Sequence, residues 1–140
     1  MTGEDGRQLG EVPAAHHDRV VARGSVARMK PLRLIETSPA AFRLERATGT
    51  TKVDDRVREL GHEPNGEFWT GLAQFLISTD APTLEGRFDY DPEAGTFIAF
   101  GRDRAALENL GALLAAVAND TERAKAVILA AEAQGFQFDD

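Results

Sequence analysis

The segment GHEPNGEFW, residues 61–69, contains residues whose types could carry chemistry. His62, Glu63 and Glu67 provide one imidazole and two carboxylates, groups that bind divalent metals or transfer protons. The spacing differs from the HExxH motif, in which two histidines lie one turn apart on a helix. Here no second histidine follows, and Pro64 interrupts the segment. A small metal-dependent or acid/base enzyme that uses these three residues is therefore the alternative hypothesis for this chain.

The rest of this segment has a structural explanation. Gly61 can end one helix, and the side chain of Asn65 can cap the next, with Pro64 stiffening the connection between them. We predict a structural motif formed by Gly61, His62, Pro64, Asn65, Gly66 and Phe68. Trp69 has two interpretations, which are core packing with its indole N–H bonded to an acceptor, and anchoring of a partner protein.

A second polar group lies in the segment DYDPE, residues 89–93. Asp89, Asp91 and Glu93 are spaced like the first ligands of a calcium loop, but the central glycine and the distal glutamate are missing and Pro92 intrudes. We interpret these carboxylates as a negatively charged, solvated turn. The sequence also has no P-loop, no GxGxxG motif and no nucleophile elbow. We therefore predict no catalytic residues, no metal and no cofactor.

The composition limits the class of protein. The chain has 140 residues, 42% of them hydrophobic, which suits one globular domain. It has no cysteine, which fits the reducing cytoplasm, and no apolar run long enough to span a bilayer. The net charge is −7, and the negative excess falls entirely in residues 29–140. Because an acidic surface repels nucleic acids and anionic membranes, we predict a protein partner instead.

The strand and helix patterns predict a small α+β domain. Alternating apolar residues indicate strands near 32–35, 42–45, 86–90 and 96–100, and helical spacing indicates helices at 51–60, 68–76, 103–118 and 120–134. Asp103 and Asp120 are the expected caps of the last two helices. The order is two β-hairpins, each followed by a helical pair, so we predict an antiparallel sheet with helices on one side.

The ends of the chain and the second hairpin carry further expectations. Residues 1–28 are expected to be a flexible extension and residues 29–140 a single domain, with Met29 a candidate natural start. Asp91 and Pro92 are expected to open the turn of the second hairpin, with Gly95 in a left-handed conformation at its end. Residues 136–138, FQF, could form a short edge strand.

Several stretches together resemble a known family. GHEPNGEFW at 61–69, DYDPEAGTFIAFG at 89–101, GFQFDD at 135–140 and MKPLRLIETSP at 29–39 are similar to segments of the immunity protein 51 family of bacterial polymorphic-toxin systems. The similarity covers residues 29–140. It implies a non-enzymatic cytoplasmic inhibitor, encoded beside a toxin, that binds and neutralises this toxin. It transfers no catalytic residues to the chain.

The contact surface must then be inferred from physical arguments. An acidic inhibitor would suit a basic toxin domain, such as a nuclease, because opposite charges speed encounter. We expect the partner to be bound by Glu63, Trp69, Asp89, Tyr90, Asp91 and Glu93. This surface assumes that the loop containing Glu63 lies beside the acidic hairpin.

Overall fold

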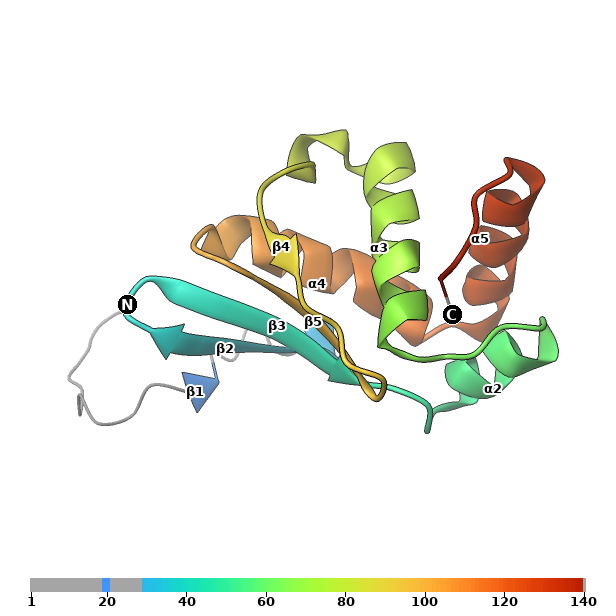
Figure 1. The fold of residues 1–140 in the computed structure, drawn as a ribbon, viewed down its shortest axis with the longest axis horizontal. Helices are drawn as coiled ribbons and strands as arrows, with labels where there is room; N and C mark the ends of the chain where they lie inside the picture. Colours follow the sequence, from blue (N-terminus) through green and yellow to red (C-terminus); the bar gives the residue numbers. More distant parts are fainter. Residues whose placement is uncertain (1–18, 21–28, 140) are drawn as a thin grey trace.

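The computed structural model describes residues 19–20 and 29–139, which form an antiparallel sheet covered by helices (Figure 1). The elements of this part of the chain are β1 (Arg19–Val20), β2 (Arg33–Ser38), β3 (Ala41–Ala47), α2 (Lys52–Glu59), α3 (Gly66–Asp80), the short 3-10 helix η1 (Pro82–Leu84), β4 (Asp89–Tyr90), β5 (Thr96–Gly101), α4 (Arg104–Ala118) and α5 (Thr121–Ala133). The predicted α+β class and the order of two hairpins, each followed by a helical pair, are confirmed.

The two hairpins join into one sheet with the strand order β1-β2-β3-β5-β4. All neighbouring strands are antiparallel, and β3 is the central strand, between β2 and β5. In this register Leu44 of β3 lies between Leu34 of β2 and Ala99 of β5. The short strand β4 is left at one edge of the sheet, because β5 pairs with β3 on its other side.

The two faces of the sheet differ because side chains alternate along a strand. Leu34, Leu44 and Ala99 have no exposed surface and face the layer of helices, in which α3 and α4 contact the strands. Figure 1 shows the helices on one side of the sheet. The alternate residues Ile98 and Phe100 therefore point to the opposite face.

The helices begin where capping side chains are available. Asn65 Oδ1 accepts a bond of 2.8 Å from the Phe68 N–H, and Asp103 Oδ1 accepts one of 3.0 Å from the Ala106 N–H. Asp120 accepts from the first turn of α5 in the same way. The predicted caps Asn65, Asp103 and Asp120 are therefore confirmed, and each satisfies backbone donors that have no partner inside the helix.

The end of α2 explains the role of Gly61. Gly61 adopts φ 92°, a left-handed conformation that favours glycine. Its N–H bonds to Arg58 O at 2.9 Å, and the N–H of His62 bonds to Val57 O at 3.1 Å. This pair of bonds is the Schellman arrangement, which satisfies the last carbonyls of a helix. Gly61 therefore ends α2, as predicted.

The second hairpin differs from the predicted turn. Asp91 and Pro92 do not open it, because the Asp91 N–H still bonds to Ile98 O at 3.0 Å and the chain stays extended to Glu93. The tight turn lies at residues 94–95, closed by bonds between Glu93 and Thr96. Gly95 has no positive φ, so the expected left-handed residue is also wrong. The acidic residues thus lie along a strand edge.

The end of the described chain also corrects one expectation. Residues 136–138 form no strand; instead the rings of Phe136 and Phe138 pack against Gly71 on α3. Arg19 and Val20, within the expected extension, pair with β2. Residues 1–18 and 21–28 lie outside the described residues, so the extension itself is not tested. No helix in the described part is long and apolar enough to cross a membrane.

Candidate functional site

The acidic residues of the second hairpin form a row along one edge of the sheet. Asp89 lies opposite Phe100, Asp91 bonds through its backbone N–H to Ile98, and Glu93 bridges to Thr96. Because strand side chains repeat every two residues, these three carboxylates share one face. The face is the one away from the helices.

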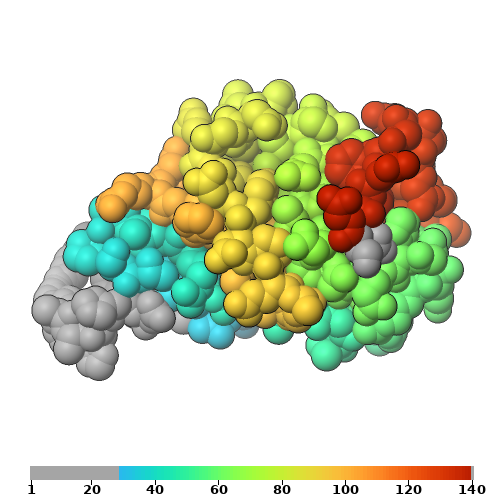
Figure 2. All heavy atoms as spheres, viewed as in Figure 1, coloured from blue at the N-terminus to red at the C-terminus, as the bar shows by residue number. Residues whose placement is uncertain are grey.

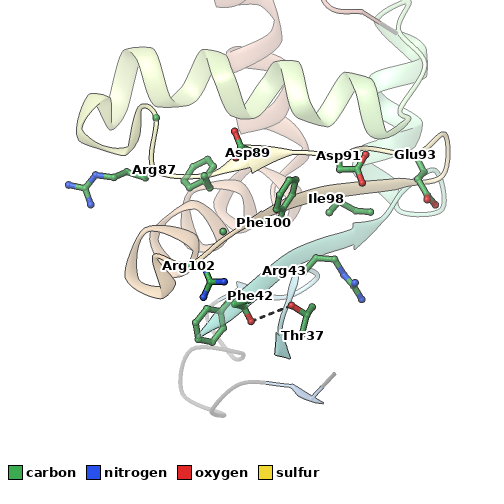
Figure 3. A pocket seen from close by; sticks show the side chains of 14 residues that line it. Thr37, Phe42, Arg43, Arg87, Asp89, Asp91, Glu93, Ile98, Phe100 and Arg102 are labelled. Atoms are coloured by element: carbon green, nitrogen blue, oxygen red, sulfur yellow. Dashed lines mark hydrogen bonds between the residues drawn. The ribbon is translucent and has the colours of Figure 1, made fainter. Parts of the chain in front are cut away.

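The carboxylates of this acidic row, Asp89, Asp91 and Glu93, are exposed to solvent. Within the described part of the chain, none of them forms an ion pair with Lys, Arg or His. Figure 3 shows them spread along the hairpin, with Ile98 and Phe100 on the adjacent strand. Their negative charges are thus not neutralised locally, and the structure brings together three residues that were predicted as partner contacts.

Tyr90 faces the other way, as the alternation requires. Its ring packs against Phe88 and Phe97, with centroids 5.7 and 6.2 Å away. Burial, followed by the negative charge of Glu85, raises the pKa of Tyr90 to about 12. Its side chain therefore supports the hairpin from the helical side and does not extend the acidic row.

The loop that contains Glu63 does lie beside the hairpin. The Gly66 N–H donates to Ala94 O at 3.2 Å, and a Cβ at Gly66 would collide with the carbonyl oxygens of Glu93 and Thr96. Only glycine permits this approach of two backbones. In the space-filling view, the yellow to orange hairpin lies on the visible face beside the green start of α3 (Figure 2). Glu63, in the same loop, is exposed.

A groove lies next to the acidic row on the outer face of the sheet. It has a volume of about 780 Å³. It is lined by Thr37, Ala41, Phe42, Arg43, Gly86, Arg87, Phe88, Asp89, Asp91, Glu93, Ile98, Phe100, Gly101 and Arg102. Ile98 and Phe100 supply its apolar floor on β5, and Phe100 is 41% exposed.

The arginines that line the groove do not neutralise the acidic row. Arg43 Nε bonds to Glu45 Oε2 at 2.7 Å, and Arg87 Nη1 bonds to Asp103 Oδ2 at 2.8 Å. Arg102 is exposed at the end of the groove where Arg87 also lies, away from Glu93 (Figure 3). The groove is thus acidic along β4 and basic at one end.

His62 is part of a different cluster. Its Nε2 lies 2.6 Å from Glu132 Oε2 on α5, and its ring contacts Phe68 and Phe138 at centroid distances of 5.6 and 5.0 Å. Glu67 is exposed at the start of α3. Among the described residues, no three His, Cys, Asp or Glu side chains are grouped to hold a metal ion. The predicted set of His62, Glu63 and Glu67 does not form such a group.

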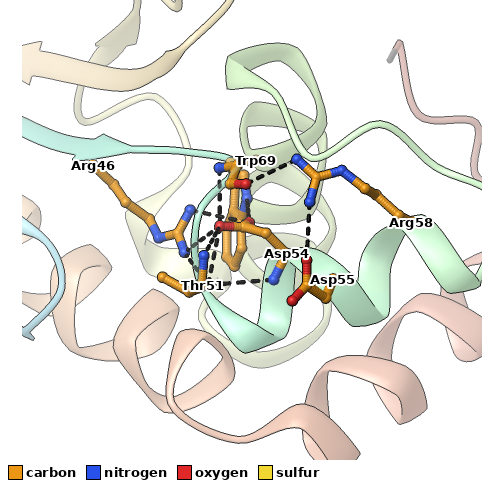
Figure 4. Close-up of polar contacts among 7 residues, drawn as sticks. Arg46, Thr51, Asp54, Asp55, Arg58 and Trp69 are labelled. Atoms are coloured by element: carbon orange, nitrogen blue, oxygen red, sulfur yellow. Dashed lines mark hydrogen bonds and ion pairs between the residues drawn. The ribbon is translucent and has the colours of Figure 1, made fainter.

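Trp69 belongs to a buried polar network that sequence reasoning did not find (Figure 4). Its side chain has no exposed surface, and its indole N–H donates to Asp54 Oδ1 at 3.3 Å. Arg46, also buried, bonds to both Asp54 oxygens at 3.3 and 3.1 Å and lies 4.4 Å from the Trp69 ring centre. Trp69 therefore packs in the core, and its indole is not available at a surface.

The ionisation of Asp54 follows from this network. Burial acts to raise the pKa of Asp54, but the hydrogen bonds and charge of Arg46 and the bonds from Thr51 lower it below its usual value. The Thr51 hydroxyl and backbone N–H lie 3.0 and 3.1 Å from Asp54 Oδ2, and the Gly49 N–H lies at 2.9 Å. Asp54 is thus held as a carboxylate that joins β3, α2 and α3.

Comparison with known proteins identifies a family for this domain. The family model for immunity protein 51 matches residues 32–133. The chain belongs to the immunity protein 51 family, and the predicted resemblance is confirmed. The match includes the segments at 61–69 and 89–101 but ends before the closing segment at 135–140. No curated protein and no solved structure matches the chain.

Proposed function

We propose that this chain is a non-enzymatic immunity protein that binds and neutralises a cognate bacterial toxin domain in the cytoplasm. The observation that carries the proposal is the family match over residues 32–133. Family membership names the class of protein, and the toxin is the partner that this class implies. The inhibitor works by occupying a surface that the toxin needs, so no catalytic group is required.

The charge of the chain supports a basic toxin. The net charge is −7, and Asp89, Asp91 and Glu93 are exposed with no ion pair to a described basic side chain. A toxin that acts on nucleic acid carries basic residues where it binds phosphates. An acidic inhibitor is drawn to this region by long-range attraction and competes there with the substrate. We therefore propose a nuclease-like toxin domain as the partner.

The proposed contact surface is the acidic row together with Glu63. Glu63 lies in the loop whose Gly66 touches the hairpin, so its charge adds to the same region. Tyr90 contributes by fixing the hairpin rather than by contact, and Trp69 is excluded because its side chain is fully buried. The carboxylates are expected to act mainly on the rate of encounter.

The test uses the purified toxin domain encoded beside this chain. A triple variant, Asp89→Lys, Asp91→Lys and Glu93→Lys, should associate about tenfold more slowly or worse at low salt. A control variant carries Asp55→Lys, Glu59→Lys and Glu122→Lys, which change the net charge equally on α2 and α5. We expect the control to slow association less, because its charges do not lie at the contact.

Two results would contradict the proposal. If the unaltered chain neither binds the toxin domain nor protects cells that express it, the chain is not the immunity protein of that toxin. If it binds and protects but the triple variant associates as fast as the control, the acidic row is not the contact surface. Stopped-flow experiments measure binding and its association rate, and survival of cells that co-express the toxin domain measures protection.

A further inference from the structure

We propose that the toxin docks on the outer face of the sheet and places an apolar side chain on Ile98 and Phe100. Lysine or arginine side chains of the toxin then lie next to it, facing Asp91 and Glu93. The inference rests on the proposed function and adds to it the contact residues and the chemistry of the toxin segment. The proposed contact differs from a purely electrostatic one, because Ile98 and Phe100 on β5 are expected to supply most of the affinity.

The apolar part of this surface is uncovered in the described structure. Phe100 is 41% exposed, and the only other large hydrophobic side chain among the described residues that is comparably exposed is Leu129, at 44%. Ile98 is half-buried beside Phe100 on the same face. The neighbouring residues Phe97 and Ala99 have no exposed surface because they face the helices. Apolar side chains on an uncovered strand face are a common site of protein association.

The groove gives this face a shape that can hold a protruding side chain. Its volume of about 780 Å³ lies within the range of clefts that enclose a ligand, which is roughly 300–1,000 Å³. Figure 3 shows Phe100 and Ile98 on β5, between the acidic row and β3. An apolar floor with a charged border is the usual composition of a binding hot spot, where the border excludes water from the centre.

The charges at the border specify the side on which the partner must be basic. On β5, Phe100 lies between Asp89 and Arg43, and Ile98 lies between Glu45 and the backbone of Asp91. Arg43 and Glu45 are joined by a bond of 2.7 Å, so the β3 side is balanced. The uncompensated negative charge is on the β4 side, where the acidic row lies. A toxin segment that fits must be basic on this side of its apolar residue.

Leu129 provides the matched comparison. It is exposed to a similar extent as Phe100, but it lies on α5 and does not line this groove. If any exposed apolar side chain were enough for binding, replacement of Leu129 would weaken the complex as much as replacement of Phe100. If binding requires the groove, only the replacement of Phe100 weakens the complex.

The experiment measures the dissociation constant of the purified toxin domain encoded beside this chain. Phe100→Ser should raise this constant about tenfold or more, whereas Leu129→Ser should change it less than about twofold. Ile98→Lys is a second variant, which should weaken binding further because it places a positive charge beside the toxin's basic residues. Circular dichroism and thermal unfolding check that each variant is folded.

The possible outcomes separate the two proposals. If the unaltered chain does not bind this toxin domain, the proposed function fails and the docking inference fails with it. If the unaltered chain binds but folded Phe100→Ser and Ile98→Lys bind as tightly as Leu129→Ser, the docking face is wrong and the proposed function stands. If Phe100→Ser and Ile98→Lys weaken binding and Leu129→Ser does not, the result supports the proposed function and the docking face.

Discussion

The indole N–H of Trp69 on α3 donates to Oδ1 of Asp54 on α2, and the same carboxylate pairs with Arg46 on β3. Arg46 and Asp54 are 1% and 0% exposed, so this ion pair lies in the core. Both carboxylate oxygens of Asp54 accept hydrogen bonds, whereas Arg46 Nε has no partner among the described residues. Breaking one partner of such a pair leaves a buried charge without compensation.

Replacing Asp54 should therefore destabilise the fold strongly. We expect Asp54→Ala to lower the free energy of unfolding by about 3–5 kcal/mol, because the Arg46 charge and the Trp69 N–H lose their acceptor. Urea unfolding followed by tryptophan fluorescence measures this. Asp55→Ala is the control, since the Asp55 carboxylate is 69% exposed and pairs with Arg58 on the same helix. Similar losses for both variants would contradict the role given to Asp54.

The same carboxylate predicts a dependence of stability on pH. Its pKa is lower in the folded state than the usual 3.8, so it favours folding whenever the pH is above this unfolded value. The contribution is lost as the pH falls through the folded pKa, because protonation then breaks the pair. Asp103, whose pKa is lowered by the Ala106 N–H and then by Arg87, acts in the same direction.

Urea unfolding between pH 7 and pH 3 tests this dependence. The unaltered chain should lose stability as the pH falls below about 4, since folded and unfolded states then bind different numbers of protons. Asp54→Asn should be less stable at pH 7 and should lose less on acidification. An unchanged slope in Asp54→Asn would show that other carboxylates cause the acid response.

The cap of α3 gives a prediction of moderate size. Asn65 Oδ1 accepts from the Phe68 N–H at 2.8 Å, so Asn65→Ala should cost about 1 kcal/mol. Asn109→Ala is the control, because Asn109 is exposed within α4, where alanine is the better helix former. Thermal unfolding of the two variants should give shifts of opposite sign. An Asn65→Ala variant with unchanged stability would contradict the capping role.

The close approach of Gly66 to the second hairpin is expected to be needed for stability. A Cβ at this position would meet the carbonyl oxygens of Glu93 and Thr96, so Gly66→Ala should cost about 2 kcal/mol or more. Gly95→Ala, at the open tip of the same hairpin, has nothing within 4 Å of the added atom and should be tolerated. Unfolding in urea compares the two. Equal stability of both variants would show that the two backbones do not need to be this close.

The docking of the closing segment can be measured through Phe138. Its ring stacks on Phe68 with centroids 4.8 Å apart and meets the His62 ring edge-on at 5.0 Å. Phe138→Ala should cost about 1 kcal/mol and should expose residues 135–139 to carboxypeptidase digestion. Gln137→Ala, whose side chain is exposed, is the control. Equal digestion rates would contradict the packing of this segment on α3.

The elements were largely predictable because local signals agree with the fold. Asp103 and Asp120 are strong capping residues directly before apolar helical patterns, and both helices begin one residue later. The buried network was not predictable in this way. Its members Arg46, Asp54 and Trp69 are separated along the chain, and only tertiary packing brings them together. A charged residue at a helical position is otherwise expected to face solvent.

The candidate site was predictable only in part. Asp89, Asp91 and Glu93 were identified from the sequence as exposed carboxylates. The predicted turn, however, gave no indication that their side chains share one face. A strand with period two places them on one side and Tyr90 on the other, as observed. Phe100 gave no comparable signal, because residues 97–100 are all apolar and their alternation cannot show which side chains point outward.

The outer face of the sheet has a consequence for how such a protein can diversify. The side chains of the acidic row and Phe100 are exposed, whereas the hairpin that carries them is held by backbone contacts at Gly66 and by the buried rings beneath it. Substitutions on this face can therefore accumulate at little cost in folding. A change of these side chains can therefore alter the surface offered to a partner while the framework beneath it stays unchanged.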